Sequence, residues 1–271
     1  FKTGTTVSTF FEYAKSGRYN YIYGGDINND GYTDFCYSVP LDEKAGWAFY
    51  GTDRIKCHLN DGQQVPRFDT VVSFDSDRPA AVGDVAGRSW TDFDGDGKAE
   101  LAVRTSDGAR DSAGTLIGRD NQDHYVSGHI GTGPEFLTMF NGETGIAMAS
   151  TTYPNERGRL ADWGGNSLGR QLNRSNRYLA GVAYVNGETP SMIWARGYYD
   201  YNGVGQTKIA AVDWKDGQFI TRWDFLAKTP GGPNPEYVYQ GAHSLSIADV
   251  DGDGRDELLV GAPFVDGGAS A

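Results

Sequence analysis

The 271-residue chain carries 36 acidic and 24 basic residues, a formal net charge of −12, with 38% apolar and 13% aromatic residues. This apolar share is enough to build a core, which excludes a disordered chain, and the negative charge disfavours nucleic acid as a partner. No window reaches the ~18 apolar residues of a membrane span, so the sequence predicts no membrane-spanning helix.

The N-terminal residues show no charged segment followed by an apolar one, so we expect a mature product or an excised piece of a longer protein. The 38 glycines and 16 tyrosines, without long Ala, Leu, Glu or Lys stretches, predict many short strands joined by tight turns. We therefore expect an all-β chain, folded as a single domain over residues 1–271.

Three acidic repeats recur along the chain. They read GGDINNDGYTDFCYSV from Gly24, TDFDGDGKAELAVRT from Thr91 and IADVDGDGRDELLVGA from Ile247, and their first aspartates are 66 and 157 residues apart. With a four-stranded blade of about 40 to 50 residues, these intervals correspond to roughly one and three blades. The spacing predicts a β-propeller of four-stranded blades, with about five blades present.

Each repeat matches a calcium-binding loop, in which oxygen ligands at positions 1, 3, 5, 7 and 9 converge on one ion and a glycine at position 6 allows the turn. An EF-hand is excluded because position 12 lacks glutamate and a strand-like segment follows each loop. The ion is expected to be structural rather than catalytic. The predicted Ca²⁺ ligands are Asp26, Asn28, Asp30, Tyr32 and Asp34; Asp92, Asp94, Asp96, Lys98 and Glu100; and Asp249, Asp251, Asp253, Arg255 and Glu257.

Cys36 and Cys57 are the two cysteines of the chain. An even pair within what looks like one hairpin region predicts a disulfide and a secreted, extracellular protein. Two unpaired buried thiols are the alternative.

The segments between the acidic loops alternate between hairpins and polar loops. The dipeptides Asn141-Gly142, Asn186-Gly187 and Asp216-Gly217 separate short apolar runs and predict two-residue turns. The stretches 153–176 and 229–235 are too polar and too rich in Gly and Pro for core strands, so we expect loops on one face.

The segments around these loops resemble a known family. DGDGKAELAVRTSDG, GPEFLTMFNGETG, YPNERG, DWGGNSLGR, NRYLAGVAYVNGETPSMIWARGYY and HSLSIADVDGDGRDELLVGA are similar to rhamnogalacturonan lyases. The resemblance implies part of an eight-bladed, calcium-binding propeller that cleaves the rhamnose–galacturonate backbone of pectin by β-elimination. Two departures are the early end after the third acidic loop and the short segment SVPLDEKAGWAF. We expect a missing C-terminal half, or self-association or a partner chain at an open edge.

β-Elimination beside a uronate carboxylate needs a cation, a base and an acid. From the resembling segments, the predicted catalytic residues are Arg196, Tyr198 and His243, and the predicted substrate-binding residues are Arg157, Asp162, Trp163 and Tyr199. Each has a structural alternative: an ion pair at a strand end for Arg196, packing for the tyrosines, a loop anchor for Trp163 and a structural hydrogen bond for His243.

Two functions follow from these observations. The first is a lyase, or a module of one, with rhamnogalacturonan as its polysaccharide partner. The second is a non-catalytic calcium-binding propeller that binds carbohydrate or serves an extracellular assembly.

Overall fold

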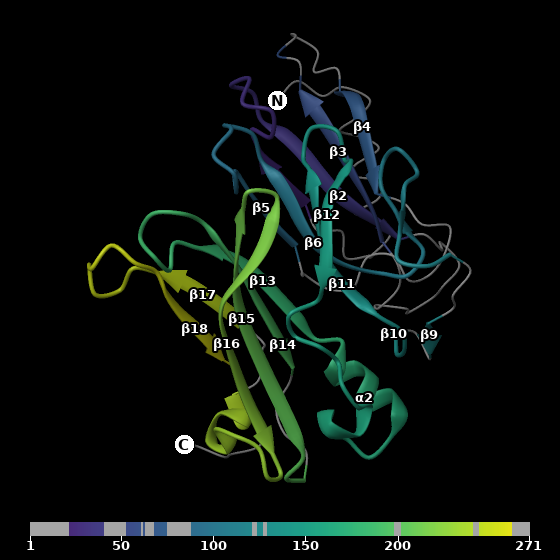
Figure 1. Cartoon of the computed structure of the whole chain (residues 1–271), viewed down its shortest axis with the longest axis vertical. Helices are drawn as coiled ribbons and strands as arrows, with labels where there is room; N and C mark the ends of the chain where they lie inside the picture. Colours follow the sequence, from purple (N-terminus) through teal and green to yellow (C-terminus); the bar gives the residue numbers. More distant parts are fainter. Residues whose placement is uncertain are drawn as a thin grey trace.

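The computed structural model of the chain describes residues 22–40, 53–60, 62, 68–74, 88–120, 124–126, 129–197, 202–240 and 244–261. Strands dominate these residues, and helix is limited to short segments (Figure 1). The all-β prediction is confirmed. In this part of the chain, no helix is both long and apolar enough to cross a membrane.

Three four-stranded antiparallel sheets follow one another along the chain, and a pair of strands follows them. In each sheet the strands lie side by side in chain order, as a meander. The first sheet holds β1 (Ile22–Gly25), β2 (Asp34–Pro40), β3 (Asp53–Asn60) and β4 (Phe68–Phe74). The second holds β5 (Arg88–Thr91), β6 (Glu100–Ser106), β11 (Glu135–Asn141) and β12 (Ala147–Thr152). The third holds β13 (Tyr178–Ala183), β14 (Ser191–Gly197), β15 (Gly205–Lys215) and β16 (Gln218–Thr229), and the last pair is β17 (Ser244–Ala248) with β18 (Glu257–Gly261).

Shorter elements fill the connections. The connection between β6 and β11 forms the hairpins β7 (Ala109–Arg110) with β8 (Leu116–Ile117) and β9 (Tyr125–Val126) with β10 (His129–Ile130). The predicted loop 153–176 instead contains the 3-10 helix η1 (Leu160–Trp163) and the helix α2 (Leu168–Ser175). The Ser167 hydroxyl caps α2 by accepting a hydrogen bond from the Arg170 N–H, and Leu172 is buried on the inner face of the helix. A second 3-10 helix, η2 (Pro235–Gln240), follows the polar stretch after β16.

Successive sheets stack face to face because their strands alternate apolar side chains between two neighbours. In β6, Leu101 and Val103 pack with residues of the first sheet, whereas Ala102 packs with the third sheet. In β14, Met192 and Trp194 pack toward the second sheet and Ile193 toward the last pair. β6 and β14 are therefore buried along their whole length.

The first strands of the sheets lie next to one another, since β13 contacts both β5 and β17. One four-stranded sheet thus lies between the sheets that carry the second and third acidic loops. The 157-residue interval corresponds to two sheet steps, not the predicted three. The insertions β7–β10 and η1–α2, together with the long strands β15 and β16, lengthen this interval.

The predicted disulfide is confirmed. Cys36 in β2 lies directly opposite Cys57 in β3, and the two form a cross-strand disulfide inside the apolar core of the first sheet. Neither residue is more than 2% exposed. The disulfide therefore links two neighbouring strands, β2 and β3. In the sequence, 12 residues that lie outside the described ranges separate these strands.

Candidate metal site and buried arginine cluster

Each acidic loop joins the first strand of a sheet to the second. The loops connect β1 to β2, β5 to β6 and β17 to β18. The corresponding turn of the third sheet, between β13 and β14, reads YVNGETP and lacks the aspartate series. The loops thus repeat at one position of the sheet, as the repeat pattern predicts.

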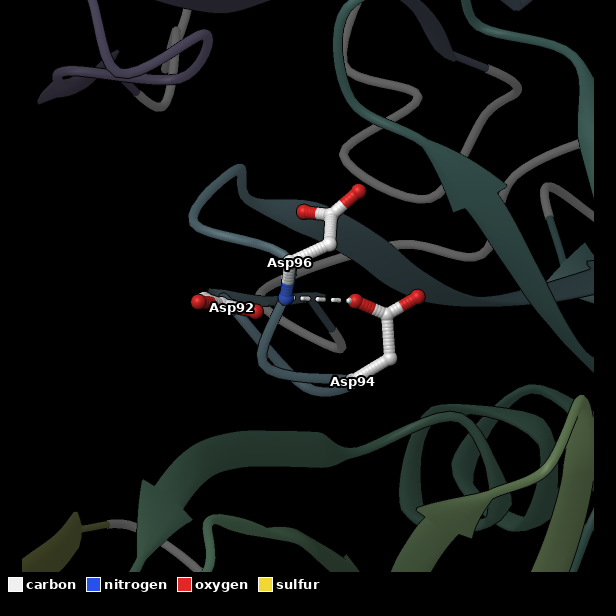
Figure 2. A group of neighbouring side chains, drawn as sticks. All are labelled: Asp92, Asp94 and Asp96. Atoms are coloured by element: carbon white, nitrogen blue, oxygen red, sulfur yellow. Dashed lines mark hydrogen bonds between the residues drawn. The ribbon is translucent and has the colours of Figure 1, made fainter.

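The second loop shows how the backbone folds the carboxylates together (Figure 2). The Asp92 carboxylate accepts the N–H groups of Gly95 at 2.7 Å and Gly97 at 2.9 Å. Asp94 accepts the Asp96 N–H at 3.1 Å. Oxygens of Asp92, Asp94 and Asp96 lie within 4.8 Å of one another. Three carboxylates this close repel each other unless a cation lies between them.

Glu100, at position 9 of the second loop, is 1% exposed. Its Oε2 accepts the Phe93 N–H at 2.9 Å, while its Oε1 is buried and has no hydrogen-bond partner in the described part of the chain. Burial, and then the charges of Asp94, Asp96 and Asp92, raise the pKa of Glu100 to about 7. An unpartnered carboxylate oxygen beside three aspartates fits a divalent cation with oxygen ligands.

The third loop repeats the grouping of carboxylates, and the first repeats the buried carboxylate at position 9. In the third, oxygens of Asp249, Asp251 and Glu257 lie within 4.8 Å of one another. In the first, Asp34 is fully buried and accepts N–H groups from Ile27 at 2.8 Å and Asn60 at 2.7 Å. Burial raises the pKa of Asp34, and these backbone hydrogen bonds oppose the rise. The carbonyls predicted as ligands at Tyr32, Lys98 and Arg255 stay predictions.

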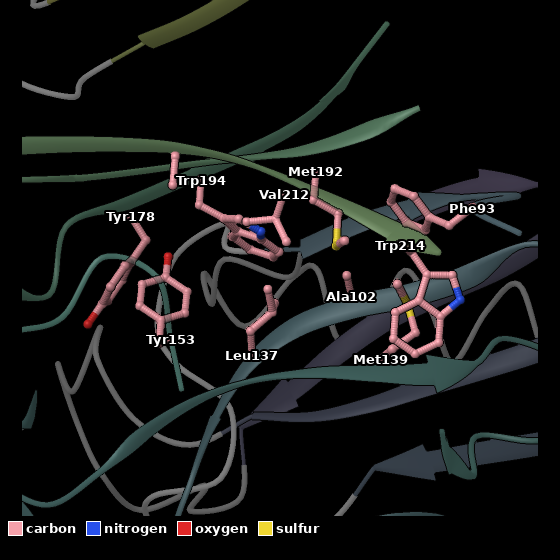
Figure 3. Close-up of a cluster of buried hydrophobic side chains, with 11 residues drawn as sticks. Phe93, Ala102, Leu137, Met139, Tyr153, Tyr178, Met192, Trp194, Val212 and Trp214 are labelled. Atoms are coloured by element: carbon pink, nitrogen blue, oxygen red, sulfur yellow. The ribbon is translucent and has the colours of Figure 1, made fainter. Parts of the chain in front are cut away.

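Between the second and third sheets, the end of the core that lies away from the second acidic loop holds a charged cluster, which we call the arginine cluster. Its members are Arg104, Glu135, Arg157, Tyr178 and Arg196. Figure 3 shows Tyr153 and Tyr178 at one end of this core and Phe93 and Trp214 at the other. Phe93 belongs to the second acidic loop, while Tyr178 belongs to the charged cluster. One apolar core therefore separates the two polar sites.

Glu135, the first residue of β11, is the centre of this arginine cluster. Its Oε1 accepts the Arg104 Nη1–H at 2.9 Å, the Tyr178 hydroxyl at 2.9 Å and the Arg196 Nη2–H at 3.2 Å. Its Oε2 accepts the Arg196 Nη1–H at 2.6 Å. Arg157 Nη2 lies 3.3 Å from Oε1. One carboxylate thus joins strands of two sheets to the connection before η1.

The cluster contains three guanidinium groups and one carboxylate, all at most 8% exposed. Although burial opposes it, the charges of Arg196, Arg104 and Arg157 lower the pKa of Glu135 to about 2. The guanidinium carbons of Arg104 and Arg196 also lie 4.4 and 4.9 Å from the centre of the Tyr178 ring. The electron-rich face of the ring attracts these cations and so stabilises part of the excess positive charge.

The structure brings three of the predicted site residues together. Arg196 is fully buried and its guanidinium also donates to the carbonyls of Ser175 and Asn155. Trp163 is 1% exposed, and its Nε1–H donates to the Arg157 carbonyl at 2.6 Å. This geometry favours the ion-pair role for Arg196 and the loop-anchor role for Trp163 over direct contact with a sugar. The catalytic role of Arg196 stays a prediction.

Asp162 lies outside the arginine cluster. Its carboxylate accepts hydrogen bonds from Lys228 and Arg159, both at 2.8 Å, and the Lys228 bond is the main cause of its lowered pKa. Tyr198, Tyr199 and His243 lie outside the described residues, so their roles stay predictions.

Sequence reasoning missed Glu135 and Arg104. Each is a charged residue inside a strand segment that also contains several apolar residues, EFLTMF for Glu135 and ELAVRT for Arg104. A charge inside such a run is a signal for a buried ion pair, because an unpaired charge there is too costly. The sequence did not indicate which charges would meet, since 31 residues separate these two.

Residues 86–270 match the family described as rhamnogalacturonan lyase family 11, C-terminal domain. The chain belongs to rhamnogalacturonan lyase family 11. The match contains the second and third acidic loops and the whole arginine cluster, and it confirms the family resemblance of the sequence. These features are therefore parts of a family 11 domain.

The chain is similar to known rhamnogalacturonan lyases. It is 48% identical over 176 residues to the rhamnogalacturonan exolyase YesX of Bacillus subtilis, covering 65% of the chain and 27% of YesX. It is 36% identical over 269 residues to the rhamnogalacturonan endolyase YesW of the same organism, covering 85% and 42%. The solved Bacillus licheniformis rhamnogalacturonan lyase PL11 is 34% identical with a TM-score of 0.70, covering 90% and 40%. The chain spans less than half the length of the curated relatives it matches.

Proposed function

We propose that the chain is part of a rhamnogalacturonan lyase that cleaves its polysaccharide by β-elimination. The observation that carries the proposal is the family 11 match, together with relatives that are an exolyase and an endolyase for rhamnogalacturonan. In this reaction a base removes the C5 proton of the uronate and the C4–O bond breaks. A C4=C5 double bond forms, and an acid protonates the leaving oxygen.

We also propose that the acidic loops hold Ca²⁺ as structural ions. The buried Glu100 Oε1 without a hydrogen bond and the grouped carboxylates of the second and third loops support this. Asp92, Asp94, Asp96 and Glu100 would bind the ion in the second loop, and it would neutralise their mutual repulsion. The ion would thereby fix the turn that leads into β6.

The arrangement of the sheets supports a propeller. Stacked four-stranded meanders with adjacent first strands are what radial blades require. We propose a single propeller domain in which the three sheets and the β17–β18 pair are consecutive blades. The disulfide supports a secreted protein.

For proton transfer, Tyr198 and His243 remain the proposed residues, with Arg157, Asp162, Trp163 and Tyr199 near the substrate. The burial of Arg157, Trp163 and Arg196 favours structural roles for these three residues, so the second candidate is a non-catalytic calcium-binding propeller that binds carbohydrate or serves an extracellular assembly. One assay separates the two functions.

Incubation with rhamnogalacturonan and Ca²⁺ should produce the ultraviolet absorbance of an unsaturated uronate, and homogalacturonan should not. The double variant Tyr198→Phe with His243→Ala should keep the melting temperature and lose the absorbance. If the wild-type chain binds rhamnogalacturonan without any rise in absorbance, the non-catalytic alternative holds and the lyase proposal fails for this chain.

A further inference from the structure

The first and second acidic loops touch through a direct backbone hydrogen bond. The N–H of Ala99, at position 8 of the second loop, donates to the carbonyl of Ile27, at position 2 of the first, at 2.9 Å. Beside it, a Cβ on Gly97 would lie 3.0 Å from the Asn29 side-chain nitrogen, so the loops are packed without a gap. Ile27 is 2% exposed.

Both ends of this hydrogen bond are attached to predicted calcium ligands. The Ile27 N–H donates to the Asp34 carboxylate of its own loop at 2.8 Å. Ala99 directly precedes Glu100, whose Oε1 is the buried oxygen without a partner. A continuous path therefore runs from Asp34 through the Ile27 peptide to Ala99 and Glu100. A carboxylate oxygen has more than one lone pair, so Asp34 can accept these N–H groups and still bind an ion.

The same link occurs once more with a different outcome. Tyr184, the first residue of the β13–β14 turn, which is one residue shorter than the acidic loops, accepts the Asp256 N–H of the third loop at 3.2 Å. Its own N–H donates to the Asp256 carboxylate at 2.6 Å, since Ser191 stands where the other sheets have an acid. The third loop is thus joined to a turn without the aspartate series. Pro190, which directly precedes β14 as Ala99 directly precedes β6, has no N–H for a link back to the second loop.

Resting on the proposed calcium binding, we infer that the first and second loops bind Ca²⁺ cooperatively and that the third loop binds it independently. An ion in the first loop fixes Asp34 and with it the Ile27 peptide. That peptide holds Ala99 in place, so the second loop loses less conformational freedom when it binds. By thermodynamic reciprocity, an ion in the second loop raises the Ca²⁺ affinity of the first loop by the same factor.

The test is calorimetric titration of the chelated full chain with Ca²⁺. One chain has only the third loop silenced, by D251N/D253N. Two others also have the first loop silenced, by D26N/D30N, or the second, by D94N/D96N. The overall constant of the two-site chain should exceed the product of the two single-site constants by about 5-fold or more.

Two further variants isolate the Ala99 N–H. Ala99→Pro removes this donor, and Pro190 shows that the equivalent turn accepts proline. In the two-site chain, Ala99→Pro should lower the overall association constant to the product of the two single-site constants. The matched control Ala99→Ser should keep the overall constant above that product. In the chain whose second loop is silenced, Ala99→Pro should leave the first-loop affinity unchanged.

The outcomes separate the two proposals. If the overall association constant of the two-site chain with Ala99 equals the product of the two single-site constants, the coupling is overturned and calcium binding stays intact. An excess that survives Ala99→Pro would overturn the Ile27–Ala99 hydrogen bond as its route. Absence of binding heat in the wild-type chain would overturn the calcium proposal, and the coupling with it.

Discussion

Glu135→Gln should lower the free energy of unfolding by roughly 3 to 5 kcal/mol, because it removes the negative partner of a buried ion cluster. Arg104, Arg157 and Arg196 would remain buried with no anion between them. The neutral glutamine amide would interact with these positive charges much more weakly than the Glu135 carboxylate does. Chemical denaturation followed by far-ultraviolet circular dichroism measures the loss.

The matched control is Glu143→Gln. Glu143 pairs with Lys98 at 2.6 Å, but both side chains are more than a third exposed, so water screens the pair and little stability should be lost. Similar losses in both variants would contradict the role assigned to Glu135.

The same cluster has a defined pH dependence. The pKa of Glu135 is lowered from its ordinary value of 4.5 to about 2, so its stabilisation is present above pH 4.5 and is lost as the pH falls toward 2. The stability difference between the wild type and Glu135→Gln should therefore shrink over this window. A difference that stays constant down to pH 2 would show that the charge of Glu135 is not its cause.

Removal of calcium should lower the melting temperature strongly. An ion present at 100 times its dissociation constant stabilises a folded protein by about 2.7 kcal/mol per site. Glu100→Gln should reduce this gain, because it removes the charge of the one fully buried carboxylate in the second loop. Thermal melts in Ca²⁺, in Mg²⁺ and in excess chelator measure the effect. Identical melting curves in Ca²⁺ and chelator would contradict structural calcium.

The repeated local patterns predicted much of the fold. Position 6 glycines with positive φ, Gly31, Gly97 and Gly254, lie at the turns that the repeats indicate. Asp216 and Gly217 form the expected tight turn between β15 and β16, both with positive φ. Such features depend on neighbouring residues, so a sequence is enough to show them.

Long-range features could not be predicted in this way. The charged cluster depends on contacts between Glu135 and Arg196, which are 61 residues apart. The number of sheets between the acidic loops was overestimated because insertions lengthen the chain without adding a sheet. The helix α2 was missed because its sequence, LGRQLNRS, has a single buried apolar residue, Leu172, to mark an inner face.

Native mass spectrometry of the chain in Ca²⁺ counts the bound ions directly. The wild type should carry one ion per acidic loop, and D94N/D96N should carry one ion fewer. The protein mass should show that the disulfide is intact in both chains. A chain that shows only its metal-free mass, under conditions in which a known calcium protein keeps its ions, would contradict calcium binding by these loops.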